Sequence, residues 1–311
     1  MENPVKQNRV NGWLVIDKPI GLTSYAVVAA IKKILKVKKV GHAGTLDPQA
    51  TGILSVAVGE ATKTICYQAD AKKTYSIKVI WGAQADTDDA DGQIINQSTS
   101  RPKQSDLLDI LSSFSGPLKQ IPPKFSAKKI KGKRAYKLAR QSETFNLSPV
   151  SVEIFNIELI NSSPDFASFI VTCSKGTYVR AIARDMGLAL SCYGHATRIR
   201  RIKVGSLDLS SSIKFDQIIS LSSSELMNIM LPTEIVLANL VEIKCTKNEF
   251  QKVSNGQAIK IESLINNQKA WASFQGSPIA LGVINDNLFI PNRILKIDPQ
   301  INSNNVNREK I

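Results

Sequence analysis

The stretch GHAGTLDPQATG, residues 41–52, decides the fold around the candidate site, because it places one carboxylate, Asp47, in a glycine-punctuated loop just before the apolar run ILSVAV, residues 53–58. Glycine adopts backbone conformations that other residues resist, and Pro48 fixes its own φ and pushes Asp47 toward extended conformations. The pattern predicts a stiff turn that holds Asp47 ahead of a buried strand. Local spacing alone leaves open that Asp47 is only a turn or cap residue, since aspartate is common in turns.

The segments on either side of this loop show strand and helix patterns. Residues 13–19 are an apolar run that ends at a proline turn, and Thr23 can cap a helix whose apolar positions recur at helical spacing through Leu35. Further strands are predicted at 73–82, 150–155 and 166–173, with a helix over 178–187 that ends at Gly187. The basic segment 124–140 has little apolar periodicity and is expected to be a mobile insertion.

The texture of the chain changes beyond about residue 238. Short β-like pieces such as 270–274 and 279–284 are separated by Asn, Gly and Pro. We therefore expect two domains: an α+β catalytic domain with a mixed sheet over residues 1–238, which carries an insertion at about 122–148, and a small β-rich domain over 239–311. The polar tail from residue 303 is expected to be disordered.

The charge of the chain indicates a polyanionic partner. Its 311 residues carry a formal net charge of +14, and the excess is grouped in segments 32–39, 124–137 and 198–203. Each group alone reads as a solvated face, but three groups together favour contacts to a phosphate backbone. The N-terminus lacks a secretory signal and no run approaches the ~20 apolar residues of a membrane span, so a cytoplasmic protein is expected.

Most other kinds of catalytic site find no support in the sequence. Four scattered cysteines and two histidines make a zinc site improbable, and no P-loop, GxSxG or GxGxxG motif is present. The acidic turn 86–91 lacks the glutamate that closes a calcium loop. The candidate chemistry therefore rests on Asp47. Arg180, which follows a glycine turn near a helix start, could orient that carboxylate or could simply be a surface arginine.

Taken together, these segments resemble the bacterial TruB family, the tRNA pseudouridine-55 synthases. The resemblance covers nearly the whole chain and rests on ordered blocks that include GWLVIDKP (12–19), GHAGTLDPQATG (41–52), GEATK (59–63), QIPP (120–123) and CSKGTYVR (173–180). It implies a pseudouridine synthase fold with a mixed, largely antiparallel central sheet, and a PUA-like RNA-binding C-terminal domain. It also implies isomerisation of uridine to pseudouridine at position 55 in the T-loop of tRNA, without a cofactor or metal, by a monomer.

The resemblance also assigns roles to individual residues. It implies that Asp47 is the catalytic aspartate, that Tyr75 stacks on the target uracil, that Arg180 pairs with Asp47, and that the insertion is an RNA-clamping thumb. The residues expected to contact RNA are His42, Lys18, Tyr178, Lys128 and Arg201. Phe125 departs from the tyrosine of many members. Three other hypotheses stay open: an RNA chaperone without chemistry, a glycosidase that releases free uracil, and a relative that works on guide RNAs with protein partners.

Overall fold

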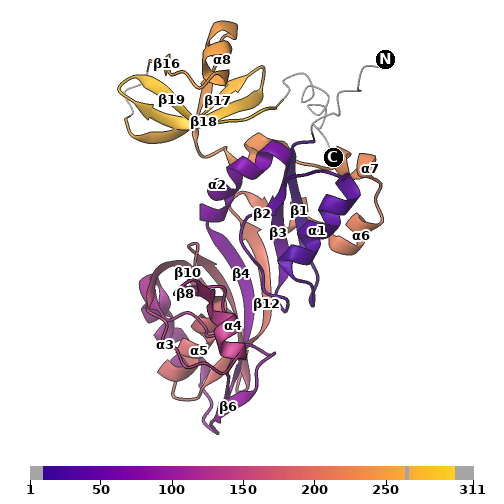
Figure 1. Cartoon of the computed structure of the whole chain (residues 1–311). Coiled ribbons are helices and arrows are strands. Elements are labelled where there is room, and N and C mark those ends of the chain that lie inside the picture. The colour runs from indigo at the N-terminus through magenta and orange to yellow at the C-terminus, as the bar shows by residue number, and fades with distance from the viewer. Residues whose placement is uncertain (1–9, 263–265, 298–311) are drawn as a thin grey trace.

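A computed structural model describes residues 10–262 and 266–297, which form a ten-stranded sheet followed by a separate five-stranded sheet (Figure 1). The predicted tail from residue 303 lies outside the described residues. The large sheet is mixed: β1 pairs with β14 and β3 with β12 in parallel, and the other pairs are antiparallel. Its strand order is β14 (Ile213–Lys214), β1 (Gly12–Lys18), β3 (Thr51–Val58), β12 (Gly194–Val204), β4 (Lys73–Trp81), β11 (Phe166–Cys173), β10 (Val150–Ser163) and β7 (Gly116–Gln120), while β2 (Val40–His42) pairs with β3 and β13 (Leu207–Asp208) with β12.

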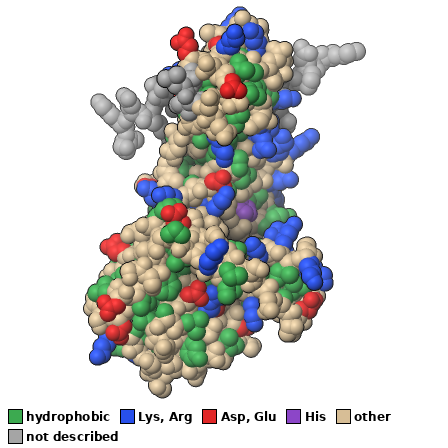
Figure 2. All heavy atoms as spheres, turned by 90° about the vertical axis from the view of Figure 1, so that its left-hand side faces the viewer, with side chains coloured by type: hydrophobic (Ala, Val, Ile, Leu, Met, Phe, Trp, Pro, Cys, Tyr) green, Lys and Arg blue, Asp and Glu red, His purple; other side chains and the backbone are tan. Residues whose placement is uncertain are grey.

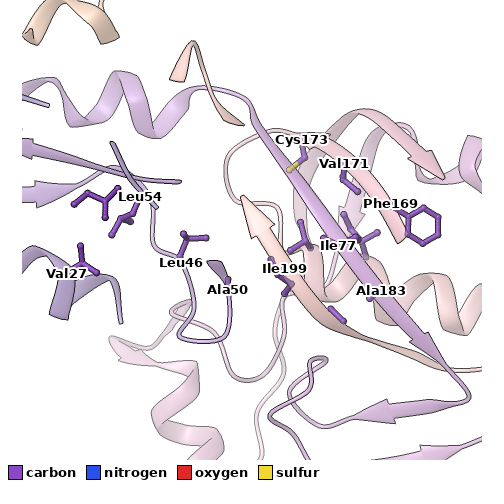
Figure 3. Close-up of a cluster of buried hydrophobic side chains, with 14 of the residues drawn as sticks. Val27, Leu46, Ala50, Leu54, Ile77, Phe169, Val171, Cys173, Ala183 and Ile199 are labelled. Atoms are coloured by element: carbon purple, nitrogen blue, oxygen red, sulfur yellow. The ribbon is translucent and has the colours of Figure 1, made fainter. Parts of the chain in front are cut away.

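Helices cover this sheet where the sequence places apolar stripes. The predicted first helix is confirmed as α1 (Ser24–Leu35), with the Thr23 hydroxyl accepting a hydrogen bond from the backbone N–H of Ala26 at 3.0 Å. Its buried residues join those of α5 (Val179–Ala189) and of the central strands in one apolar cluster, part of which Figure 3 shows. The other α-helices described before residue 238 are α2 (Ile65–Asp70), α3 (Gln104–Leu111), α4 (Ala135–Arg140), α6 (Phe215–Ile219) and α7 (Ser223–Asn228).

Strands β4 and β12 run side by side through the middle of the large sheet and join its two halves (Figure 1). Strand β12 lies between β4 and β3, and on the β3 side its residue Arg201 pairs with Gly52. Gly52 has φ +95°, and a Cβ there would lie 2.2 Å from the Arg201 carbonyl oxygen, so only glycine fits this close approach. The loop that carries Asp47 enters β3 at this crossing and is thereby set between the two halves.

Two sequence expectations differ from the structure. Helix α5 does not end at Gly187 but continues to Ala189; Gly187 instead allows close packing, because a Cβ there would lie 2.2 Å from the backbone nitrogen of Gly194. The basic insertion is not irregular throughout. It forms a short hairpin of β8 (Lys129–Ile130) and β9 (Lys133–Arg134), followed by α4 (Ala135–Arg140). A second hairpin, β5 (Ala83–Ala85) with β6 (Ile94–Gln97), encloses the acidic turn.

The second sheet has the strand order β15 (Val241–Lys244), β17 (Gln268–Phe274), β18 (Ser277–Asn285), β19 (Leu288–Ile294) and β16 (Ile259–Lys260), with α8 (Lys247–Ser254) packed on it. It contacts the region around α2: Lys63 Nζ donates to the Ile294 carbonyl at 2.6 Å, and the Lys296 N–H to Glu60 at 3.0 Å. In the part of the chain that the structure describes, no helix is both long enough and apolar enough to cross a membrane.

Candidate active site

The Asp47 loop is pinned to the first strand and helix of the chain. The Ser24 hydroxyl both accepts from the Leu46 N–H and donates to the Leu46 carbonyl, each at 2.9 Å. The Lys18 ammonium is fully buried and donates to the carbonyls of Pro48 at 3.1 Å and of Leu22 and Pro19 at 2.8 Å. Burial lowers the pKa of Lys18 to about 8, against the opposing charge of Asp47. The residues on either side of Asp47, Leu46 and Pro48, are therefore fixed by hydrogen bonds from Ser24 and Lys18.

Arg201 supports the loop from the other side. Its side chain is buried, with 1% of the residue exposed, and its guanidinium donates to the carbonyls of Ile53 at 2.7 Å and Gly44 at 3.1 Å. Gly44 has φ +95°, which turns the chain so that its carbonyl faces the guanidinium. A planar guanidinium carries five N–H donors in a fixed fork, so it can bond to carbonyls of both the loop and the strand that follows it. The loop is thus held by two buried cations, Lys18 and Arg201.

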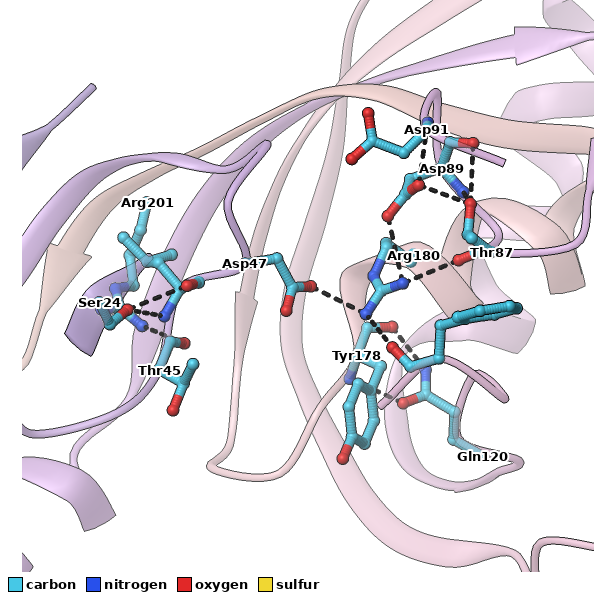
Figure 4. Close-up of polar contacts among 12 residues, drawn as sticks. Ser24, Thr45, Asp47, Thr87, Asp89, Asp91, Gln120, Tyr178, Arg180 and Arg201 are labelled. Atoms are coloured by element: carbon cyan, nitrogen blue, oxygen red, sulfur yellow. Dashed lines mark hydrogen bonds and ion pairs between the residues drawn. The ribbon is translucent and has the colours of Figure 1, made fainter. Parts of the chain in front are cut away.

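Asp47 reaches from this loop to Arg180, at the start of α5, and the two form an ion pair of 2.8 Å (Figure 4). The same guanidinium also bonds to Asp89 at 3.1 Å, to the Thr87 carbonyl at 2.8 Å and to the Phe125 carbonyl at 3.1 Å. The side chain of Arg180 is only 5% exposed, whereas that of Asp47 is 46% exposed. Arg180 is therefore a fixed cation that orients a carboxylate open to a ligand.

Two cavities meet at the Asp47–Arg180 pair. The smaller, about 280 Å³, is lined by Tyr75, Tyr178, Lys73 and Arg201 among others, and its volume is at the low end of the range for small-molecule sites. The larger, about 910 Å³, lies between the start of α1 and the insertion and is lined by His42, Tyr25, Tyr136, Arg134 and Arg140 among others. The arrangement offers a carboxylate with an aromatic-lined pocket on one side and a basic groove on the other.

The electrostatics of Tyr75 and His42 follow from their positions. Tyr75 lies on β4 opposite Arg201 of β12; burial raises the pKa of its phenol, while the charge of Arg201 opposes this rise. Tyr75 is therefore a hydroxyl that can donate a hydrogen bond into the smaller cavity. Burial lowers the pKa of His42, and the charge of Arg201 lowers it further, so His42 is a neutral ring at neutral pH.

Comparison with known proteins shows the family of this chain. Residues 32–179 match the model of the TruB family pseudouridylate synthase (N terminal domain), and residues 180–238 match that of the tRNA pseudouridylate synthase B C-terminal domain. A tRNA pseudouridine synthase B of Ruegeria sp. (strain TM1040) is 44% identical over 298 residues, which are 94% of this chain and 98% of that protein. The chain belongs to the TruB family of pseudouridylate synthases.

Other TruB-family relatives and distant structures agree. The tRNA pseudouridine synthase B of Ehrlichia ruminantium (strain Gardel) is 40% identical over 295 residues, 92% of this chain and 99% of that protein. Among solved structures, the chain is similar to one in the archaeal box H/ACA sRNP Nop10-Cbf5 complex, with TM-score 0.71, 19% identity and coverage of 95% of this chain and 89% of that one. An H/ACA RNP bound to a substrate RNA gives TM-score 0.72 at 18% identity, over 96% and 88% of the two chains. These two likenesses confirm the predicted α+β pseudouridine synthase fold.

The structure brings together most of the residues that the sequence of this TruB-family chain singled out. Asp47, Tyr75, Tyr178, Arg180 and Arg201 all line the smaller cavity. Tyr178 is held there by Gln120, whose side chain accepts from the Tyr178 N–H at 2.8 Å and donates to its carbonyl at 3.1 Å. His42 lines only the wider cavity, although its loop also leads to Asp47.

Two residues that were expected to contact RNA, Lys18 and Lys128, do not line either cavity at Asp47. Lys18 is buried beneath the loop with three carbonyl acceptors, so the structure gives it a supporting position instead of the RNA contact that we expected. Lys128 is exposed on the insertion and lines neither cavity at Asp47. In the basic group 198–203, the buried Arg201 guanidinium holds carbonyls, whereas Arg200 forms a bidentate pair with Asp17 at 2.7 and 2.9 Å and its side chain stays 38% exposed. Contacts of this group to phosphate stay a prediction.

Sequence reasoning missed Asp89 and Gln120 as parts of the site. The only signal for Asp89 in the sequence was a cluster of aspartates in a turn, which the calcium comparison obscured, because its partner Arg180 lies far away along the chain. Within residues 10–262 and 266–297, no group of three or more His, Cys, Asp or Glu side chains could hold a metal ion. The acidic turn binds arginine instead.

Figure 2 shows that lysine and arginine side chains gather along the right-hand edge of the face drawn there.

Proposed function

We propose that this chain isomerises uridine to pseudouridine at position 55 in the T-loop of tRNA, with Asp47 as the catalytic residue. The observation that carries the proposal is the Asp47–Arg180 ion pair of 2.8 Å at the mouth of a cavity of about 280 Å³. The names of the similar proteins, tRNA pseudouridine synthase B, support the substrate class. The net charge of +14 supports a polyanion as partner.

The reaction fits the groups at the site. The N1–C1′ bond of uridine breaks, the freed base turns, C5 bonds to C1′, and the proton leaves C5 while N1 gains one, so that no oxidant or cofactor is needed. Asp47 acts at the sugar, and Tyr75 and Tyr178 hold the detached uracil in the cavity. The phenol of Tyr75 also stands where a proton can be relayed to or from the base.

Two routes at the sugar are open to Asp47: attack of the carboxylate on C1′, or removal of the 2′ proton. Both need a carboxylate oriented by Arg180. They differ in one measurable respect, because removal of the proton breaks the C2′–H bond. A target uridine deuterated at C2′ slows the reaction if elimination is rate-limiting and leaves direct attack almost unaffected.

The target base must leave the RNA stack to reach the cavity. The wider cavity beside Asp47 supports this step, because it combines the neutral ring of His42 with the aromatic and basic side chains of the insertion, including Tyr136 and Arg140. We infer that His42 fills the position that the uridine vacates, and that the insertion clamps the RNA backbone through Lys128 and its neighbours. The β-rich domain after residue 238 is inferred to be a second, PUA-like RNA contact.

The test is a pseudouridine assay on an unmodified tRNA transcript, with the modified position mapped and released uracil measured in the same reaction. The proposal predicts pseudouridine at position 55 and no free uracil. Free uracil would show a glycosidase, and pseudouridine at another position would show a different RNA target. Improved folding of the tRNA without any modification would show a chaperone only.

A further inference from the structure

Helix α5 carries a second arginine whose contacts repeat those of the first. Arg184 follows Arg180 by four residues, so the two side chains lie one turn apart on the same face of the helix. Arg184 pairs with Asp88 at 2.9 Å and with Asp185 at 2.8 Å, and donates to the Ile121 carbonyl at 2.8 Å. Its side chain is 13% exposed and that of Asp88 only 6%.

Both arginines therefore form polar contacts with the same two segments. One is the acidic turn, where Arg180 holds Thr87 and Asp89 and Arg184 holds the residue between them. The other is the beginning of the insertion, where Arg184 donates to the carbonyl of Ile121, just before it, and Arg180 to the carbonyl of Phe125, within it.

The acidic turn is itself anchored to the central sheet through Asp88. Its N–H donates to the Ala85 carbonyl and its carbonyl accepts from the Ala196 N–H on β12, each at 3.1 Å. Asp88 adopts φ +61°, in the left-handed region that aspartate tolerates better than most residues other than glycine. Arg184 thus connects three parts of the structure: helix α5, the large sheet through the acidic turn, and the beginning of the insertion.

Arg184 lines neither of the two cavities that meet at Asp47. It lines a third, of about 920 Å³, between the β5–β6 hairpin, α5 and the returning end of the insertion at residues 142–147. Any effect of Arg184 on the chemistry must therefore pass through Arg180 and the insertion. A buried ion pair is also a weak source of stability compared with apolar packing, so a positioning role accounts better for this one.

We propose that Arg184, paired with Asp88, is a positioning residue that fixes the beginning of the RNA-binding insertion relative to Arg180. In this way it couples RNA binding by the insertion to the orientation of the Asp47 carboxylate. The coupling to catalysis rests on the proposed function; the positioning of the insertion does not. Without Arg184, no side chain bonds to both the Ile121 carbonyl and Asp88. The acidic turn and the beginning of the insertion, which both supply hydrogen-bond acceptors to Arg180, can then shift relative to each other.

The experiment compares Arg184→Met, Arg184→Lys, Asp88→Asn and the Asp88→Asn/Arg184→Met double variant with the wild type. Arg101→Met is the matched control, because Arg101 also pairs with an aspartate, Asp165 at 3.0 Å, and donates to two backbone carbonyls, those of Ser98 and Ser100. Three quantities are measured: hydrogen exchange of residues 121–140 without RNA, the Kd for a T-arm stem-loop, and the single-turnover rate at saturating RNA.

For Arg184→Met we expect exchange across 121–140 to rise about tenfold, the Kd to rise about fivefold and the single-turnover rate to fall about tenfold, while exchange of β11 stays unchanged. Arg184→Lys keeps the charge opposite Asp88 but not the fork that also reaches Ile121, so we expect it to recover part of the rate and little of the protection. The free energy of unfolding in urea, measured in addition on the same variants, should fall less in the double variant than in Arg184→Met, because no uncompensated carboxylate remains.

Equal exchange, Kd and rate in Arg184→Met and Arg101→Met would overturn the proposal, as would a loss of protection spread evenly over the whole chain. If Arg184→Met does not fold, Asp88→Asn, which preserves the side-chain size, decides the matter by the same three readouts. If the wild type made no pseudouridine, exchange and RNA affinity would still test the positioning of the insertion separately from the proposed function.

Discussion

Replacing Arg180 by methionine tests how the site holds its carboxylate. The substitution keeps an unbranched apolar stem and removes the guanidinium, and with it both ion pairs and both carbonyl bonds. The Asp89 side chain, only 10% exposed, loses the cation it pairs with, and breaking a buried pair in this way costs about 3–5 kcal/mol. The Asp47 side chain is 46% exposed and stays solvated, so it adds little to that cost.

The same substitution should separate stability from catalysis. We expect the free energy of unfolding in urea to fall by about 3–5 kcal/mol. We expect the single-turnover rate of pseudouridine formation to fall about 10²–10³-fold, the usual cost of removing one preorganised charge-stabilising donor. The Kd for RNA should change less than about threefold, because the Arg180 side chain is buried and offers RNA little surface.

A double variant, Asp89→Asn/Arg180→Met, makes the reasoning refutable. It removes the uncompensated carboxylate, so most of the lost stability should return, but it does not restore the donor to Asp47, so the rate should stay low. A single-turnover rate for Arg180→Met within about threefold of wild type would refute the orienting role of Arg180. Recovery of the rate together with stability in the double variant would show that the defect was one of folding.

Three further predictions follow from the supports of the site. Arg201→Met should lower the free energy of unfolding by about 2–4 kcal/mol, because carbonyls of the Asp47 loop lose their buried donor, and should slow single turnover; an unchanged rate would contradict the loop assignment. Changing the exposed Lys128, Lys129 and Lys133 to Gln should flatten the salt dependence of RNA binding by up to about three phosphate contacts, and an unaltered slope would show that the insertion does not touch phosphate. Burial raises the pKa of Asp88 from 3.8 to about 6 despite Arg184, so between these two pH values Asp88 binds more protons in the folded protein than in the unfolded chain. The free energy of unfolding of the wild type relative to Asp88→Asn should therefore fall by up to about 3 kcal/mol as the pH rises from about 4 to about 6. A difference between the two proteins that does not change with pH in urea unfolding would contradict this.

The sequence predicted the scaffold of the site well, because local signals and tertiary structure agree there. The Asp47 loop, the capped helix before it and the strand carrying Tyr75 depend on proline and glycine geometry, side-chain caps and alternation of apolar residues. The residues alone left the pairing of Asp47 with Arg180 open against a surface arginine, and only the family resemblance implied it. Their separation in sequence leaves no local signal for such a contact.

The remaining features depended on close packing or on burial that composition does not show. Gly187 looks like a helix end in sequence, yet it serves the contact with Gly194. Lys18 and Arg201 look like RNA ligands in a basic chain, but both are buried with backbone carbonyls as acceptors. Asp88 and Asp89 look like a failed calcium loop and instead face two arginines from a distant helix.

The central claim is that Asp47 performs the chemistry of a tRNA pseudouridine synthase. Its most direct test is pseudouridine formation at position 55 of an unmodified tRNA transcript by wild type and Asp47→Asn, with RNA affinity measured on both proteins. The account predicts product with the wild type only, at a Kd that the substitution leaves within about threefold, since asparagine keeps the shape of the side chain. Product from Asp47→Asn at the wild-type rate would contradict it.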